Sequence, residues 1–204
     1  MKLLGRADSL NVRKVLWAMD EMGIEMPRED YGGPFGKTDT PEYRRWNPAG
    51  LVPTLIDGDA AVWESNTIIR YLGSKHPDAG FFGHTPAAAA SASQWMDWQL
   101  GTLNPFLQRI FAQSQLGDKR DQKVFDDNKS GVEKQFENVL AGSLMDKEFI
   151  LGAKITAADI CLGVMLHRYV SLLGTGTLNK RVAQYHAKLA ERPAFKSRVA
   201  IGKP

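Results

Sequence analysis

The feature that most constrains the fold of this chain is a change of pattern near residue 86. Before that point, short apolar runs alternate with short helical patterns and with turns rich in glycine and proline. From Pro86 onward the apolar residues recur only at helical spacing. We therefore expect an N-terminal α/β domain over residues 1–79, a linker over 80–86 and an all-α helical bundle over 87–204. A length of 204 residues accommodates two small domains.

The N-terminal part predicts the element order βαβαββα, a small open sheet with helices. Asp57-Gly58 separates the last two apolar runs and tolerates the positive φ angles of a tight hairpin, so these two strands should be antiparallel. The expected elements are a strand at Lys2–Leu4, a helix through Val12–Met19, a strand at Ile24–Met26, a short helix at Pro41–Trp46, strands at Val52–Ile56 and Ala60–Trp63, and a helix capped by Ser65.

The C-terminal part predicts helices only. One long helix should run through Trp95 and Ile110 with a kink at Pro105, and a second should follow Gly117. The segment from Thr156 to Asp159 has the spacing of a capping box, which indicates a helix start and a structural role. Two further helices complete the bundle, at Leu178–Leu189 and, with Pro193 at its start, Ala194–Ala200.

Composition excludes several classes of function. The 26 basic and 23 acidic residues are mixed along the chain, so no nucleic-acid tract is indicated. Cys161 is the single cysteine, which excludes an intrachain disulfide and a four-cysteine zinc site. The four histidines lack ligand spacing, so we expect no metal. No apolar run approaches the roughly 18 residues that span a bilayer, so we expect no membrane association and a cytoplasmic protein.

Two local features point to a binding site. Pro53 lies inside an apparent strand although it cannot donate a ladder hydrogen bond, which fits either an ordinary edge strand or a backbone bend that serves a ligand. Glu64-Ser65 joins a strand to a helix, where free N–H groups and the helix dipole favour an anion. Ser65 is equally suited to be a simple N-cap.

Four segments stand out by their order and spacing along the chain. They are Ser9-Leu10-Asn11-Val12-Arg13-Lys14, Asn47-Pro48-Ala49-Gly50-Leu51-Val52-Pro53-Thr54-Leu55, Glu64-Ser65, and Thr156 to Asp159. Together they resemble the glutathione S-transferase superfamily, and in particular its serine-type, theta- or beta-like bacterial members with a Ser-x-Asn motif. The resemblance implies a thioredoxin-like N-terminal domain, with glutathione as co-substrate.

The resemblance also implies how glutathione is held. A cis bond before Pro53 turns Val52 outward, so that its main-chain N–H and C=O pair with the cysteinyl amides. The hydroxyl and N–H of Ser65 bind the γ-glutamyl carboxylate, and Glu64 meets the ammonium group. Asn66 is expected to assist, and Lys37 to approach the glycyl carboxylate.

Ser9 and Asn11 are the expected catalytic residues, since either can donate a hydrogen bond to the bound thiolate. Each is also suited to be a helix cap. Leu10 stands where cysteine-type classes carry a nucleophile, which disfavours that mechanism. The resemblance implies a homodimeric transferase that activates the glutathione thiol for attack on small electrophiles. Glutathione-dependent disulfide or peroxide reduction, glutathione-dependent isomerisation or dehalogenation, and a non-catalytic interaction module remain alternatives.

Overall fold

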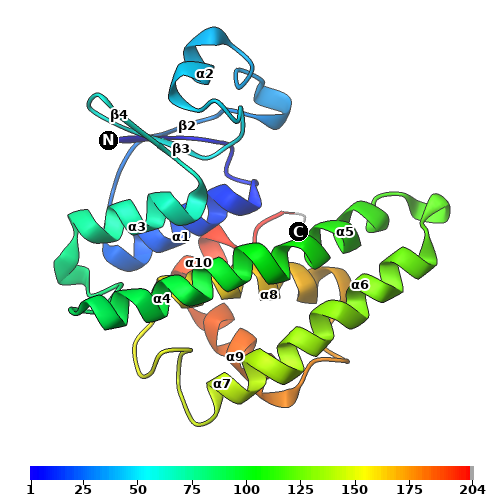
Figure 1. The fold of residues 1–204 in the computed structure, drawn as a ribbon. Coiled ribbons are helices and arrows are strands. Elements are labelled where there is room, and N and C mark those ends of the chain that lie inside the picture. The colour runs from blue at the N-terminus through cyan, green and yellow to red at the C-terminus, as the bar shows by residue number, and fades with distance from the viewer. Residues whose placement is uncertain (203–204) are drawn as a thin grey trace. The chain divides into compact units, whose positions relative to one another are not determined.

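The computed structural model describes residues 1–202, and the chain forms two compact units. Of the described residues, the first unit holds Met1–His84 together with 193–202, and the second holds Thr85–Arg192. Figure 1 shows a small sheet with its helices in the first unit and an assembly of helices in the second.

The elements of the first unit confirm the predicted order; they are β1 Lys2–Leu4, α1 Leu10–Met22, β2 Arg28–Glu29, α2 Pro41–Trp46, β3 Thr54–Asp57, β4 Ala60–Trp63 and α3 Ser65–Lys75. The strands form a four-stranded mixed sheet of the order β2-β1-β3-β4. Strand β1 pairs parallel with β2 and antiparallel with β3, and β3 pairs antiparallel with β4. Helices α1 and α3 lie side by side against one face, and α2 lies on the opposite side of the sheet (Figure 1).

The core of this unit lies between the sheet and the helices α1 and α3. Leu3 and Leu55 are paired across β1 and β3 and are both fully buried. Val12 and Val15 on α1 and Ile68 on α3 are likewise fully buried. Their spacing places them on one face of each helix, and burying that face against the sheet contributes about 1.5–3 kcal/mol per side chain.

Two predicted boundaries in this unit are wrong. The second strand is Arg28–Glu29 rather than Ile24–Met26, because α1 closes in a left-handed turn at Gly23 and the N–H of Ile24 still bonds to the carbonyl of Met19 at 2.9 Å. Strand β3 begins at Thr54, so Pro53 precedes the strand instead of lying inside it.

The second unit is helical, as predicted. Its elements are α4 Pro86–Trp98, the π-helical turn η3 Gln99–Leu103, α5 Asn104–Ser114, the short turn η4 Gly117–Lys119, α6 Gln122–Gln135, the π-helical turn η5 Phe136–Ala141, α7 Gly142–Leu144, α8 Ala157–Leu173 and α9 Lys180–Glu191. The π-helical turn η3 ends two residues before Pro105, which has no N–H to continue the regular ladder. The predicted capping box is present at the start of α8.

The last helix, α10 Pro193–Arg198, groups with the first unit, whereas the sequence pattern assigned it to the helical domain. Phe195 packs edge-on against Trp17 with ring centroids 5.0 Å apart. Arg198 forms an ion pair with Asp20 at 2.7 Å. Helical periodicity shows that a segment is a helix but not which neighbour buries its apolar face, so this docking was not readable from the sequence.

Candidate functional site

A shallow pocket in the first unit collects most of the predicted site residues. It encloses about 30 Å³, so a ligand of peptide size would lie along it rather than inside it. The residues that line it come from several different elements. They are Asn11, Asn47, Ala49, Leu51, Val52, Pro53, Trp63, Glu64 and Ser65.

The bend at Val52 and Pro53 forms one wall of the pocket, and the bond between these residues is cis, as the resemblance implied. A buried polar network holds the chain on either side of the bend. The hydroxyl of Tyr43 donates to the carbonyl of Leu51 at 2.6 Å and lies 2.8 Å from the hydroxyl of Thr54. This network leaves the backbone of Val52, which forms no strand ladder there, at the pocket surface.

Asn47 completes the same network from the end of α2. Its amide donates to the Leu51 carbonyl at 2.8 Å and to the Thr54 hydroxyl at 3.0 Å, while its own carbonyl accepts from the N–H of Ala49 at 3.0 Å. Asn47 is only 2 % exposed. It lay within the motif that carried the resemblance, but its structural role was not identified from the sequence.

The opposite wall is the start of α3. The predicted cap is wrong by one residue: Glu64 occupies the N-cap position and Ser65 is the first residue of the helix. Glu64 has a φ of 66°, a left-handed conformation that is rare for residues other than glycine and that is often found at functional sites. Free N–H groups at the start of α3 therefore accompany the Ser65 side chain at the pocket.

Asn11 lies in the first turn of α1 and faces this wall. Its side-chain carbonyl accepts a hydrogen bond from the Ser65 hydroxyl at 3.3 Å. Because the carbonyl oxygen is engaged, the side-chain amide is the group of Asn11 left to donate to a ligand. Ser9, by contrast, is not among the residues that line the pocket; it is the N-cap of α1, it is 9 % exposed, and its side chain makes no capping hydrogen bond.

Asn66 and Lys37, the remaining predicted residues, lie outside the pocket lining. Asn66 follows Ser65 in α3, is 2 % exposed and accepts a hydrogen bond from the buried ammonium group of Lys14 at 2.9 Å. Lys37 is exposed, donates to the carbonyl of Asp30 at 3.3 Å and lies over the ring of Tyr31. The structure thus places Asn66 in a supporting position and Lys37 on a surface loop.

Apart from Asn47, the pocket residues that were not predicted from the sequence have apolar side chains. Ala49, Leu51 and Trp63 line the pocket, and Leu51 and Trp63 are 66 % and 37 % exposed. Exposed apolar side chains beside a polar pocket are a signal of ligand or partner contact. That signal requires knowledge of exposure and so could not be read from the sequence.

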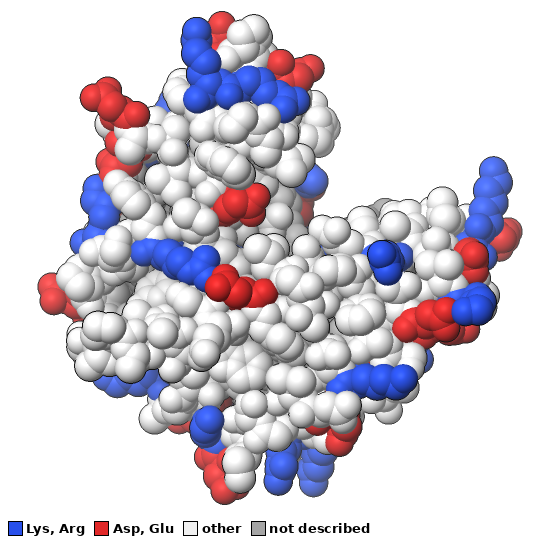
Figure 2. Space-filling model, viewed as in Figure 1, with Lys and Arg blue, Asp and Glu red and all other residues white. Residues whose placement is uncertain are grey.

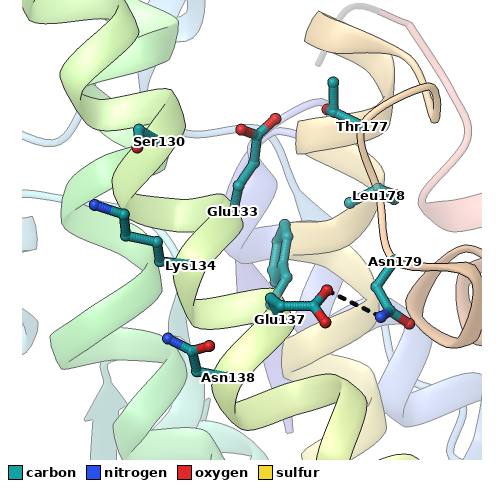
Figure 3. Close-up of a pocket in the computed structure, with 9 residues that line it drawn as sticks. Ser130, Glu133, Lys134, Glu137, Asn138, Thr177, Leu178 and Asn179 are labelled. Atoms are coloured by element: carbon teal, nitrogen blue, oxygen red, sulfur yellow. Dashed lines mark hydrogen bonds between the residues drawn. The ribbon is translucent and has the colours of Figure 1, made fainter.

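A larger cavity, of about 290 Å³, belongs to the helical unit and is lined by residues of α6, η5 and the segment before α9. Figure 3 shows the carboxylates of Glu133 and Glu137 directed into it, with Asn179 bonded to Glu137. Tyr169 donates to Glu133, so both carboxylates already have partners within the chain. None of the predicted site residues lines this cavity.

Charge on the visible face of the molecule is mixed, with basic and acidic side chains interspersed between wide neutral areas (Figure 2). Within residues 1–202, no group of three or more His, Cys, Asp or Glu side chains is arranged to hold a metal ion. No helix in the same range is both long enough and apolar enough to cross a bilayer.

Comparison with known proteins assigns both units to related families. Residues 8–75 match the family model for the glutathione S-transferase N-terminal domain, and residues 101–198 match the one for the C-terminal domain. The chain is 31% identical to glutathione S-transferase GstB of Escherichia coli, over 98% of this chain and 97% of the relative. It is 28% identical to glutathione S-transferase 1 of Zea mays, over 100% of this chain and 98% of that protein.

The solved structures agree. A theta class glutathione S-transferase from Xanthomonas axonopodis pv. citri, with glutathione bound, superposes with a TM-score of 0.84 and 30% identity, covering 100% of this chain and 98% of that one. A glutathione S-transferase-I bound with lactoylglutathione superposes with a TM-score of 0.83 and 27% identity, covering 98% of each chain.

Proposed function

The chain belongs to the glutathione S-transferase family and takes glutathione as its co-substrate, and we propose that the pocket at Pro53 binds glutathione and that Asn11 activates its thiol. One observation carries the assignment of the site. Asn11, Val52, Glu64 and Ser65, residues separated by up to 54 positions in the sequence, line one pocket around the cis proline. Conjugation of glutathione to a small electrophile is favoured over reduction and over a non-catalytic interaction role.

The backbone supplies the main contacts in this proposal. The N–H and C=O of Val52 pair with the amides of the cysteinyl residue of glutathione, much as an added strand pairs with a sheet edge. The N–H of Ser65, at the positive end of the α3 dipole, binds the γ-glutamyl carboxylate. The Ser65 hydroxyl leaves the Asn11 carbonyl, to which it donates in the free protein, and donates to the same carboxylate. The carboxylate of Glu64 binds the ammonium group of the same residue.

Activation requires only a modest change in thiol acidity. A free thiol has a pKa near 8.5, and lowering it by about two units corresponds to roughly 2.7 kcal/mol of preferential stabilisation of the thiolate. A hydrogen bond to a charged group contributes about 1.5–3 kcal/mol, and the start of a helix adds about 0.3–1 kcal/mol. In this proposal the side-chain amide of Asn11 supplies the hydrogen bond, and the backbone N–H groups at the start of α1, where Asn11 stands, supply the helix contribution.

Two measurements test this function. Titration calorimetry with glutathione should give saturable heat, and Ser65→Ala should weaken the affinity. No heat at millimolar glutathione would exclude the Pro53 pocket as the glutathione site. Thiolate formation, followed by ultraviolet absorbance of the enzyme–glutathione complex against pH, should shift to higher pH in Asn11→Ala. An unchanged profile would remove Asn11 from activation while leaving binding intact.

We also propose that the protein is a homodimer and that it resides in the cytoplasm. Half-exposed Trp95 and Trp98, one helical turn apart on α4 with ring centroids 5.3 Å apart, provide an aromatic face suited to a subunit contact. Sedimentation should give twice the mass of 22.6 kDa, and a monomer at micromolar concentration would contradict the dimer.

The proposed location rests on the state of the single cysteine. Cys161 is buried and reduced, which suits a reducing compartment.

A further inference from the structure

Arg168, on helix α8 of the helical unit, is a buried cation to which the described residues supply no anion. Its side chain is only 9 % exposed. Its Nε is fully enclosed and finds no acceptor within the described part of the chain. The guanidinium lies over the ring of Phe111 on α5, with 4.2 Å between its Cζ atom and the centroid of the ring.

The residues one turn before Arg168 on its own helix are apolar. Val164 and Met165, one turn earlier on the same face of α8, are buried. Burial lowers the pKa of Arg168, and no acidic group among residues 1–202 raises it in return. By comparison, Arg13, which is buried in the first unit, donates to the carbonyl of Val199 at 3.2 Å. A buried charge is ordinarily paired, so an arginine without an anion needs a reason.

We propose that Arg168 and Phe111 form a binding site for an organic monocarboxylate with an apolar body. No residue of the Pro53 pocket takes part in this site, and its existence does not depend on the glutathione assignment. It adds a second recognition element to the protein, one selective for negative charge.

The chemistry of the site selects this class of ligand. The guanidinium presents a planar fork of N–H groups that matches the two oxygens of a carboxylate. Because Nε is enclosed and the residue keeps 9 % exposure, the terminal amino groups are the part of the fork that a ligand reaches. One positive charge balances a monoanion, whereas a phosphate dianion needs further cations. The half-exposed ring of Phe111 suits an apolar or aromatic body.

The same chemistry has two possible sources, which are a carboxylate carried by the electrophilic second substrate and a carboxylate ligand that does not react. The first test concerns binding alone and uses the full-length protein without glutathione. Benzoate and its uncharged isostere benzamide are titrated separately by calorimetry and by thermal shift at neutral pH. Benzoate should bind and raise the melting temperature, and benzamide should bind at least tenfold more weakly.

Variants link this binding to Arg168. Arg168→Met should reduce benzoate affinity at least tenfold, and Arg168→Lys, which keeps the charge without the fork, should reduce it less. Arg109→Leu, which removes an exposed arginine two residues before Phe111, is the matched control and should leave benzoate binding unchanged. Equal binding of benzoate and benzamide by the unmodified protein, or equal benzoate affinity in Arg168→Met, would overturn the proposal. The first of these comparisons needs no variant and holds even if a substitution prevents folding.

A kinetic arm distinguishes the two sources. Chlorodinitrobenzene electrophiles with and without a ring carboxylate are compared in the unmodified protein and in Arg168→Met. A loss of kcat/KM of at least fivefold that is confined to the carboxylate-bearing electrophile assigns the site to the second substrate. Unchanged kcat/KM for both, together with Arg168-dependent benzoate binding, assigns it to a non-reacting carboxylate ligand.

Discussion

The start of helix α8 and the Pro53 pocket are both built on buried polar groups, but only the first is closed. Asp159 is fully buried, and both of its oxygens are filled by donors of the chain itself: the N–H groups of Ile150 and Thr156 and the hydroxyls of Thr156 and Tyr185, at 2.6–2.9 Å. At the pocket, the network around Asn47 is closed, whereas Asn11 and Ser65 bond to each other and still face the open side.

This difference separates residues that hold the fold from residues that contact a ligand. A closed network leaves no group free to bind anything, so its loss should appear as lost stability. An open network keeps donors available at a surface, so its loss should appear as lost binding or catalysis with little change in stability. Substitutions in the two networks should therefore separate loss of stability from loss of activity.

Asp159→Ala should have the largest effect. It removes the acceptor for backbone and hydroxyl donors that are buried, and each unsatisfied group costs about 1–3 kcal/mol, so we expect a loss of about 3–5 kcal/mol in the free energy of unfolding. Urea denaturation followed by circular dichroism measures it. Asp146→Ala, which removes an exposed carboxylate, is the control and should cost little. A loss below 1 kcal/mol in Asp159→Ala would show that the closed network is not structural.

The lowered pKa of His186 predicts how the stability of the helical unit depends on pH. Burial, together with the nearby His167, lowers the pKa of His186 to about 4. The unfolded chain, with a histidine pKa near 6.5, therefore binds more protons between these values, so the free energy of unfolding should fall as the pH drops from about 6.5 to 4. We expect a decrease of about 2–3 kcal/mol from this residue.

The measurement for His186 is the urea midpoint at several pH values across that range. His186→Gln should flatten the dependence, whereas His84→Gln, at an exposed position, should leave it intact. A slope that survives in His186→Gln would assign the acid sensitivity to other groups.

Asn11→Ala addresses the open network. Removing the amide donor should lower kcat/KM for conjugation about 10- to 100-fold, because the interaction with the thiolate is lost when charge develops on sulfur. The melting temperature should change little, because Asn11 is hydrogen-bonded to Ser65 and not to the closed network around Asn47. A loss of activity below tenfold would remove this residue from thiol activation. A large drop in melting temperature would instead place Asn11 among the residues that hold the fold.

Asn47→Ala lies between the two classes, because Asn47 belongs to a closed network and also lines the pocket. We expect a loss of about 1–2 kcal/mol in stability, since Tyr43 still donates to the Leu51 carbonyl after the substitution. Glutathione affinity should also fall severalfold because the Val52 segment loses one of its supports. Calorimetry and urea denaturation on the same sample measure both effects, with exposed Asn138→Ala as the control.

The sequence predicted the elements of both units and the capping box at the start of α8. The capping box at Thr156 and Asp159 and the hairpin at Asp57-Gly58 are local patterns, so their structures follow from neighbouring residues. The second strand was misplaced because the closing turn of α1 at Gly23 extends beyond its last helical residue.

The finer arrangement of the site depends on contacts between distant parts of the chain. The bond from Ser65 to Asn11 joins residues 54 positions apart, and it is the feature that separates Asn11 from Ser9. No local pattern distinguishes two polar residues at one helix start. The isolation of Arg168 was likewise hidden, because its burial and its lack of an anion depend on the packing of α5 against α8.

Ser9→Ala should have the smallest effect of the series and is the most direct test of the open network. Ser9 and Asn11 stand two residues apart at the same helix start, yet only Asn11 lines the pocket and bonds to Ser65. The Ser9 side chain forms no capping bond, so its loss should change kcat/KM less than about threefold and stability by less than about 0.5 kcal/mol. A loss of kcat/KM equal to that of Asn11→Ala would mean that ligand binding draws the Ser9 hydroxyl toward the sulfur, and thiol activation would then be shared between the two residues.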